Sequence, residues 1–200
     1  MDKAPRPEQP QSFLPKVSEA TFAAFLRDVQ EKSPREMIPY FQTIQQENPE
    51  IDQVLKTLVF DEDNEMRPGS EDVMTAAAIV YTTLRKQAEA KRMEKELQGR
   101  ATNESHLLPT ATKETVDVIE KEFIDWAVRE NKDPASYCLK HVELIKQENP
   151  EIGRFLEQRS LDENGSVRPE RVLSFFIGVT FYRSLRQQAE ADKMKKDFPG

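Results

Sequence analysis

The sequence predicts an all-α fold, a tandem duplication of two four-helix modules packed together. Three observations lead to this prediction. The chain has only six glycines in 200 residues, whereas sheet-rich folds need glycine at many tight turns. Apolar residues recur at spacings of three and four along most of its length, which is the period of an amphipathic helix. The block QENPEI occurs twice, at 46–51 and at 147–152.

The repeat extends far beyond that block at a constant offset of 101 residues. Without a gap, it aligns Tyr81 with Tyr182 and the run QAEA at 87–90 with the same run at 188–191. From 13/114 to 99/200 there are 25 identities in 87 aligned pairs. Self-similarity at one register predicts two homologous domains. We therefore expect a disordered tail at 1–12, helical module 1 at 13–99, a linker at 99–112 and helical module 2 at 113–200.

The first predicted helix of each module has an apolar face at helical spacing. Phe22 and Phe25 form this face in module 1, and Phe123 and Trp126 form it in module 2. Such a face is buried against neighbouring helices in a globular protein. Ser18 precedes the helix of module 1 and is a candidate N-cap.

The second and third helices are delimited by proline. Ser-Pro at 33–34 and Asp-Pro at 133–134 place a capping residue before a proline, so the second helix is expected to begin there. Asn-Pro at 48–49 and at 149–150 predicts that it stops at the asparagine and that a short third helix starts at the proline. The apolar side chains of the third helices are expected to face inward: Ile51, Val54, Leu55, Leu58, Ile152, Phe155 and Leu156.

The last helix of each module is predicted to be the longest, running to about Leu97 or Phe198. Its first half is apolar on most sides, which is typical of a buried central helix. Its second half is charged and is expected to project over the surface. The turn signal Asn-Gly at 164–165 also allows a short hairpin just before this helix, pairing Phe60 with Met66 and Leu161 with Val167.

Composition and charge exclude several classes of protein. The 29 basic and 36 acidic residues give a net charge of −7, which argues against nucleic acid as the main partner. The longest nearly apolar stretch, 172–182, is far shorter than the roughly 20 residues of a membrane span. The first residues contain no apolar signal core, and the single Cys138 cannot form an internal disulfide. We therefore expect a cytoplasmic protein with no membrane partner.

Repeated carboxylates are the weak candidates for a metal site. Glu-x-x-Glu pairs and acidic loops recur in both modules, at Glu47, Glu50, Glu148, Glu151, Asp61 and Asp162. Oxygen clusters suit Mg²⁺ or Ca²⁺, but the loops lack the glycine and glutamate positions of an EF-hand. The pair Cys138 and His141 supplies too few ligands for tetrahedral zinc. The sequence therefore favours no metal and no cofactor, and a divalent-metal-dependent enzyme at the two helix junctions is the alternative function.

The sequence favours a non-enzymatic protein-interaction or scaffold module, because no nucleophile–base set and no phosphate-binding glycine-rich loop is present. Basic residues near the ends of the last helices are interspersed with glutamates, which indicates a charged helix surface and not a nucleic-acid interface. The partner is expected to be a protein or a second copy of the chain. The candidate partner-binding residues are Arg85, Glu89, Arg186, Glu190 and Phe176, of which Phe176 is expected to fill a contact between modules or copies.

Overall fold

The computed structural model describes residues 12–30, 32, 34–63, 65–100, 102, 106–129 and 134–198. Within these ranges the chain is all-helical, with eight α-helices, two short 3₁₀-helices and no β-strand. The predicted all-α class is confirmed. The predicted tail, apart from Ser12, lies outside the described residues, as do Ser33 and Asp133.

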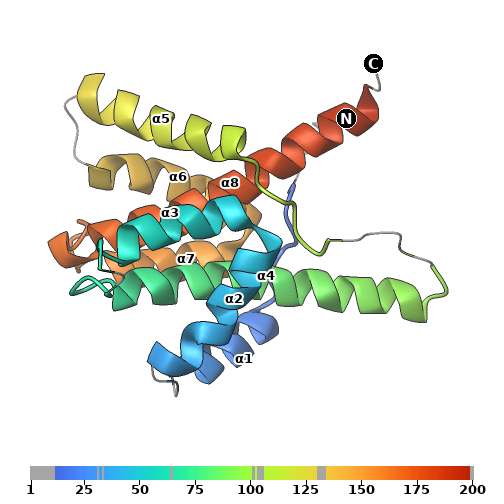
Figure 1. Ribbon diagram of the computed structural model, residues 1–200. Helices are drawn as coiled ribbons and strands as arrows, with labels where there is room; N and C mark the ends of the chain where they lie inside the picture. Colours follow the sequence, from blue (N-terminus) through green and yellow to red (C-terminus); the bar gives the residue numbers. More distant parts are fainter. Residues whose placement is uncertain are drawn as a thin grey trace, which may run out of the picture.

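In the described residues, each half of the chain contains four α-helices, of which the last is the longest, but the 3₁₀ turns stand at different places in the two halves (Figure 1). The N-terminal half contains α1 (Glu19–Gln30), the 3₁₀ turn η1 (Pro34–Met37), α2 (Ile38–Glu47), α3 (Pro49–Val59) and α4 (Glu71–Leu97). The C-terminal half contains α5 (Lys113–Arg129), α6 (Pro134–Glu148), α7 (Pro150–Ser160), the 3₁₀ turn η2 (Pro169–Arg171) and α8 (Val172–Asp197).

The two longest helices, α4 and α8, pack against each other at the centre of the molecule (Figure 1). Most residues of 73–84 and 174–185 are buried, and the largest of them, Tyr81 and Tyr182, are fully buried. The C-terminal parts of both helices project from the bundle, as their charged sequences predict. Figure 1 shows these two ends diverging from each other.

The junctions between the second and third helices lie where the sequence predicts them. α2 ends at Glu47 and α3 begins at Pro49, and the same break separates α6 from α7. Asn48 leaves the helical region, with φ −141° and ψ 72°, because a following proline disfavours the helical conformation. The position of α2 differs from the prediction in one respect. It begins at Ile38 after a 3₁₀ turn, since Pro39 is tolerated only in the first turn of an α-helix.

The turns ahead of α4 and α8 contain the residue pairs of the predicted hairpins, but no strands form among the residues that the structure describes. Phe60 bridges Met66, and Leu161 bridges Val167, each as a single antiparallel bridge without a strand. Gly165 lies in the turn between Leu161 and Val167 with φ +76°, a conformation that glycine adopts without steric cost.

The segment between α4 and α5 is more than the polar linker that the sequence predicts. Leu108 and Ala111 are buried in the core, and so are Leu14 and Val17 of the segment ahead of α1. Apolar burial therefore fixes both segments against the bundle before the following helix begins. Among the described residues, no helix is long and apolar enough to cross a lipid bilayer.

Candidate functional site

The two repeated blocks of sequence come together in a buried polar cluster at the α2–α3 junction. Asn48 Nδ2 donates a hydrogen bond to Tyr81 Oη at 2.8 Å, and Asn48 Oδ1 accepts the backbone N–H of Ala111 at 2.6 Å. Tyr81 donates to one oxygen of Glu47 at 2.8 Å, and Arg85 Nε donates to the other at 2.6 Å. The QENPE block and the Tyr-x-x-Leu-Arg block therefore form a single junction.

The same cluster recurs around Asn149 at the α6–α7 junction. Asn149 Nδ2 donates to Tyr182 Oη at 2.8 Å, and its Oδ1 accepts the backbone N–H of Val17 at 2.6 Å. Glu148 accepts hydrogen bonds from Tyr182 at 3.0 Å and from Arg186 at 2.7 Å. Each asparagine thus binds the segment that leads into the first helix of the opposite half. The two segments cross between the halves and tie them together.

Burial sets the protonation of the two tyrosines. Burial away from solvent raises the pKa of Tyr81 and of Tyr182 well above the usual value for tyrosine. The hydrogen bonds from Asn48 and Asn149 lower these pKa values, whereas the negative charges of Glu47 and Glu148 raise them further. Each hydroxyl therefore stays protonated and donates a hydrogen bond to one oxygen of the neighbouring glutamate. Arg85 and Arg186 donate to the other oxygen of Glu47 and Glu148. The carboxylates of Glu47 and Glu148 are occupied by partners within the chain.

The structure separates the remaining metal candidates from these clusters. Glu151 forms an ion pair with Arg154, and Glu50 lies at the edge of a groove described below. Asp61 Oδ1 accepts the backbone N–H groups of Asp63 and Glu65, at 3.1 and 2.8 Å, so its carboxylate stabilises a turn. Asp162 makes the equivalent contacts in the C-terminal half. The part of the chain that the structure describes has no group of three or more His, Cys, Asp or Glu suited to hold a metal.

The predicted partner-binding charges lie on α4 and α8 next to the clusters. Arg85 pairs with Glu89 at 3.8 Å and Arg186 pairs with Glu190 at 3.1 Å, in addition to their bonds to the buried glutamates. The guanidinium groups are mostly covered, with 29% and 22% of the side chains exposed. The i, i+4 pairs expected from the sequence are therefore present beside an intramolecular role for each arginine.

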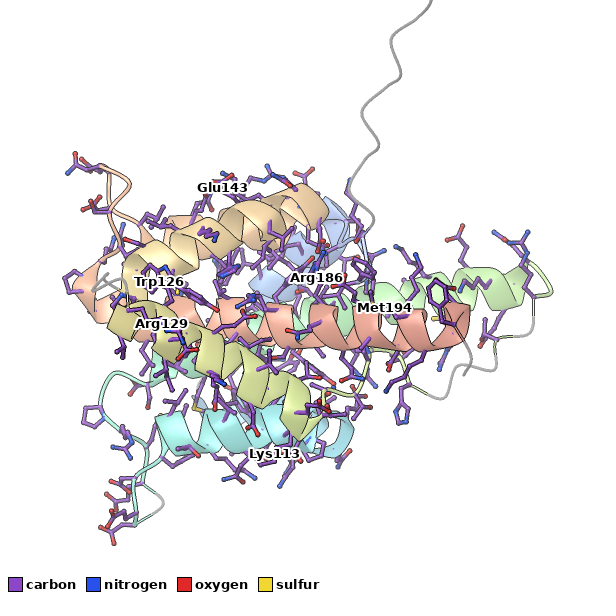
Figure 2. All side chains as sticks on the ribbon, turned by 90° about the horizontal axis from the view of Figure 1, so that it is seen from above. Lys113, Trp126, Arg129, Glu143, Arg186 and Met194 are labelled. Carbon is purple, nitrogen blue, oxygen red and sulfur yellow. The ribbon has the colours of Figure 1, made fainter. Side chains whose placement is uncertain are left out.

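Phe176, the fifth predicted partner-binding residue, lies in a groove between α3 and α5. The groove has a volume of about 420 Å³. Figure 2 shows α5 from Lys113 at one end to Arg129 at the other, and α3 packs against α5. The Phe176 ring comes from α8 and packs on the Phe123 ring, with 4.2 Å between centroids. Apolar side chains from three helices form the walls: Val54, Leu58, Val116, Phe123, Ile124 and Phe176.

The groove adds to one sequence-based expectation. Val54 and Leu58 pack against the core, as expected, but both are only half-buried and also line the groove. On α5, Ile124 is 57% exposed and Val128, one turn further, is 75% exposed. Leu173 precedes Phe176 by one turn of α8 and is also exposed. The apolar surface is therefore wider than the groove itself.

The counterpart contact, 101 residues away, is only partly filled, because Thr75 and Arg159, the counterparts of Phe176 and Leu58, line a pocket of about 230 Å³. Phe155, the counterpart of Val54, packs edge-to-face on Phe22 of α1 with centroids 5.7 Å apart, and it is 7% exposed. Arg159, the counterpart of Leu58, forms an ion pair with Asp72. The aromatic pair therefore narrows the α7–α1 contact, and the ion pair joins α7 to α4. The α3–α5 contact has smaller apolar residues at these positions and stays hollow.

Acidic side chains border the α3–α5 groove. Glu50 lies on the α3 side, and Asp117 and Glu120 lie on the α5 side with one cation, Lys113. Lys113 Nζ is 2.6 Å from Asp117. The hydrogen bond to Asp117 raises the pKa of Lys113, and the charges of Asp117, Glu50 and Glu120 add to this effect. The groove therefore combines apolar walls with a rim that attracts positive charge.

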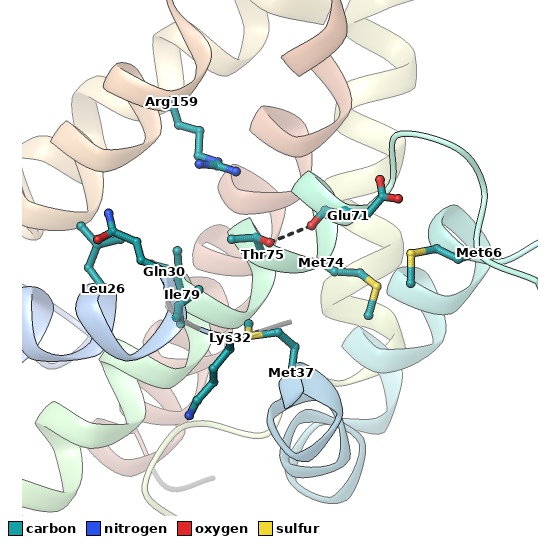
Figure 3. A pocket seen from close by; sticks show the side chains of 11 residues that line it. Leu26, Gln30, Lys32, Met37, Met66, Glu71, Met74, Thr75, Ile79 and Arg159 are labelled. Carbon is teal, nitrogen blue, oxygen red and sulfur yellow. Dashed lines mark hydrogen bonds between the residues drawn. The ribbon is translucent and has the colours of Figure 1, made fainter. Parts of the chain in front are cut away.

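A second pocket, of about 230 Å³, lies between α1, η1 and α4 (Figure 3). Figure 3 shows three methionines, Met37, Met66 and Met74, with Arg159 at the opposite side. Thr75 lies between them and donates to the Glu71 carbonyl at 2.8 Å. This pocket is about half the size of the groove, and flexible methionines adapt to the space that they line. It carries no arrangement of polar groups converging on a ligand.

His141 and Cys138 lie on α6 without a metal-binding arrangement. Cys138 is fully buried. Burial lowers the pKa of His141 to about 4, and the charges of Arg183 and Lys140 act in the same direction while Glu122 opposes them. The imidazole is therefore neutral near pH 7 and packs on the Tyr137 ring with 4.4 Å between centroids.

Sequence reasoning found Phe176 but missed the groove around it. Its other walls, Val54, Leu58 and Ile124, look like ordinary core positions of amphipathic helices. The available signal was the comparison of the repeats, in which Val54 stands opposite Phe155 and Leu58 opposite Arg159. No family model, no curated protein and no solved structure matches the chain.

Proposed function

We propose that the protein is a non-enzymatic interaction module whose α3–α5 groove binds an amphipathic helix of a protein partner. One observation carries the proposal: Val54 lines an apolar groove of about 420 Å³, whereas the larger Phe155 packs on Phe22 at the counterpart contact, where the pocket is about 230 Å³. A monomeric protein rarely exposes a broad apolar surface without a partner.

The shape and charge of the groove select the kind of partner. A groove between two helices accepts a third helix that inserts apolar residues at positions i, i+3, i+4 and i+7. The acidic rim of Glu50, Asp117 and Glu120 favours basic residues beside that apolar face. The proposed ligand is therefore a short helix that is apolar on one side and basic along its edges.

We also infer a tandem duplication with modules at 13–99 and 113–200 joined through 99–112. The identities at an offset of 101 support this inference, as do the equivalent hydrogen bonds of Asn48 and Asn149. On this view, one of two equivalent contacts kept a wide groove, and an aromatic pair narrowed the other. The reducing cytoplasm remains the expected location of the module.

The experiment compares two synthetic peptides that carry Leu at positions i, i+3, i+4 and i+7. One peptide has Lys at its polar positions and the other has Glu. Titration calorimetry with the full chain should give a dissociation constant on the order of 10 µM for the Lys peptide. The Glu peptide should bind at least about tenfold more weakly, because its charges face the acidic rim.

Two variants locate the binding. Val54→Phe should weaken binding of the Lys peptide about tenfold or more, because the new ring occupies the groove without entering the core. The matched control, Phe155→Val, changes the counterpart contact and should leave the affinity unaltered. Equal binding of both peptides, or unchanged binding by the Val54→Phe variant, would contradict the proposal.

A further inference from the structure

The projecting end of α8 carries the features that the groove would accept. Met194 and Phe198 are 59% and 83% exposed. Phe198 directly follows the last residue of α8, and its backbone N–H donates to the Met194 carbonyl at 3.0 Å, so the two residues lie one helical turn apart. Large apolar side chains at such exposure on a projecting helix indicate a contact surface.

The charges beside this apolar face are mainly positive. Lys193, Lys195 and Lys196 accompany Asp192 and Asp197, so lysines outnumber aspartates at this end of α8. The rim of the groove has an excess of negative charge, with Glu50, Asp117 and Glu120 outnumbering Lys113. The two surfaces therefore match in hydrophobicity and complement each other in charge.

The end of α8 cannot fill the groove of its own chain. Phe176 in the groove and Met194 at the projecting end belong to one continuous helix, so about 27 Å of helix axis separates them. In Figure 2, Met194 lies on the part of α8 that extends beyond α5, far from Trp126 and Arg129. Only another molecule can bring this end into the groove.

We propose that the groove binds the C-terminal end of α8 from a second copy of the chain, with Met194 and Phe198 inserted between α3 and α5. This proposal rests on the proposed function, since it names the helix that the groove binds. The contact joins two different surfaces, so it either closes a dimer by exchange in both directions or continues into a chain of molecules.

Sedimentation velocity of the full chain tests the proposal. The wild type should show a concentration-dependent rise in mass between about 1 and 100 µM, a range set by single-groove affinity. Met194→Glu with Phe198→Glu should abolish the rise, and Val54→Phe should abolish it too. The end of α4 has the same spacing of exposed apolar residues, so Met93→Glu with Leu97→Glu distinguishes the two helix ends. This variant should still associate, and loss of its association would overturn the assignment to α8.

Mixing gives the sharpest outcome. The Met194/Phe198 variant keeps its groove and the Val54 variant keeps its α8 end, so an equimolar mixture should form a one-to-one complex although neither variant associates alone. A wild type that stays monomeric at 100 µM, or a mixture that stays monomeric, would overturn the self-association. If the monomeric protein still binds the Lys peptide in a Val54-dependent manner, the proposed function stands. If the protein neither associates with itself nor binds the Lys peptide, both the self-association and the proposed function are overturned.

Discussion

At the scale of single residues, Asn48 and Asn149 decide how the halves of the chain are joined. Each is fully buried. In each, the side-chain oxygen accepts a hydrogen bond from a backbone N–H, and the side-chain amide nitrogen donates one to a tyrosine hydroxyl. The sequence predicts these residues only as helix terminators before proline. That they also join the two halves could not be predicted, because they bind the backbone N–H groups of Ala111 and Val17. These residues are distant in sequence, and a backbone contact does not depend on the type of side chain.

Asn48→Ala should lower the free energy of unfolding by about 2–4 kcal/mol, because it removes the acceptor of the buried Ala111 N–H and the donor to the Tyr81 hydroxyl, which keeps only its bond to Glu47. Urea denaturation measures the loss. Hydrogen exchange should also show faster exchange of the Ala111 amide, since its acceptor is removed. Gln46→Ala, an exposed change two residues away, is the control and should change stability by less than about 0.5 kcal/mol. A similar loss for both variants would refute the role given to Asn48.

His141 makes stability depend on pH. Its pKa is about 4 in the folded chain and about 6.5 in an unfolded chain. Between these values the unfolded state binds more protons, so stability is complete above about pH 6.5 and falls as the pH drops toward 4.

Relative to His141→Gln, the wild type should lose about 1 kcal/mol of stability between pH 7 and pH 4.5, an amount reduced from the full shift because the ring is partly exposed. Chemical denaturation at both pH values provides the comparison. The difference between the two proteins isolates this histidine, because His106 and all carboxylates are common to both. Parallel pH profiles would show that His141 does not contribute.

At the scale of helices, the sequence determines where elements begin and end more clearly than how they pack. Proline fixed the α2–α3 and α6–α7 breaks, and apolar periodicity indicated the buried halves of α4 and α8. The α3–α5 groove was not predictable, because Val54 and Leu58 satisfy the helical pattern whether they face a core or a groove. Whether these residues face a core or a groove depends on the distance between α3 and α5, which belong to different halves of the chain. The sequence of one helix alone does not determine that distance.

Close packing of α6 and α7 depends on Gly153. A Cβ atom there would lie 2.8 Å from the Lys146 backbone nitrogen and Cα, and 2.3 Å from Lys146 Cγ. Gly153→Ala should therefore destabilise the protein by about 1–3 kcal/mol through overpacking, even though alanine favours the helix by about 1 kcal/mol. Thermal unfolding should show a lower Tm for this variant. Gln158→Ala, exposed on the same helix, should leave the Tm unchanged, and an increased Tm for Gly153→Ala would contradict the close contact.

At the scale of the whole molecule, two similar polar junctions and two dissimilar interhelix contacts join the halves of the chain. The two polar junctions keep the same residues and the same hydrogen bonds, so they hold the halves together from both sides. The two interhelix contacts differ in size, with an aromatic pair beside a pocket of about 230 Å³ at α7–α1 and an apolar groove of about 420 Å³ at α3–α5. Function is therefore proposed where the halves differ, and structural stability is attributed to the positions where they agree.

The most direct test of the groove as a helix-binding site is a methyl NMR titration of the full chain with the Lys peptide. Methyl signals of Val54, Leu58 and Ile124 should shift with a common dissociation constant, because these side chains line the groove. Signals of Met93 and Leu97, on the projecting end of α4, should stay in place. Unchanged methyl signals in the groove, or larger shifts at the end of α4, would contradict the account.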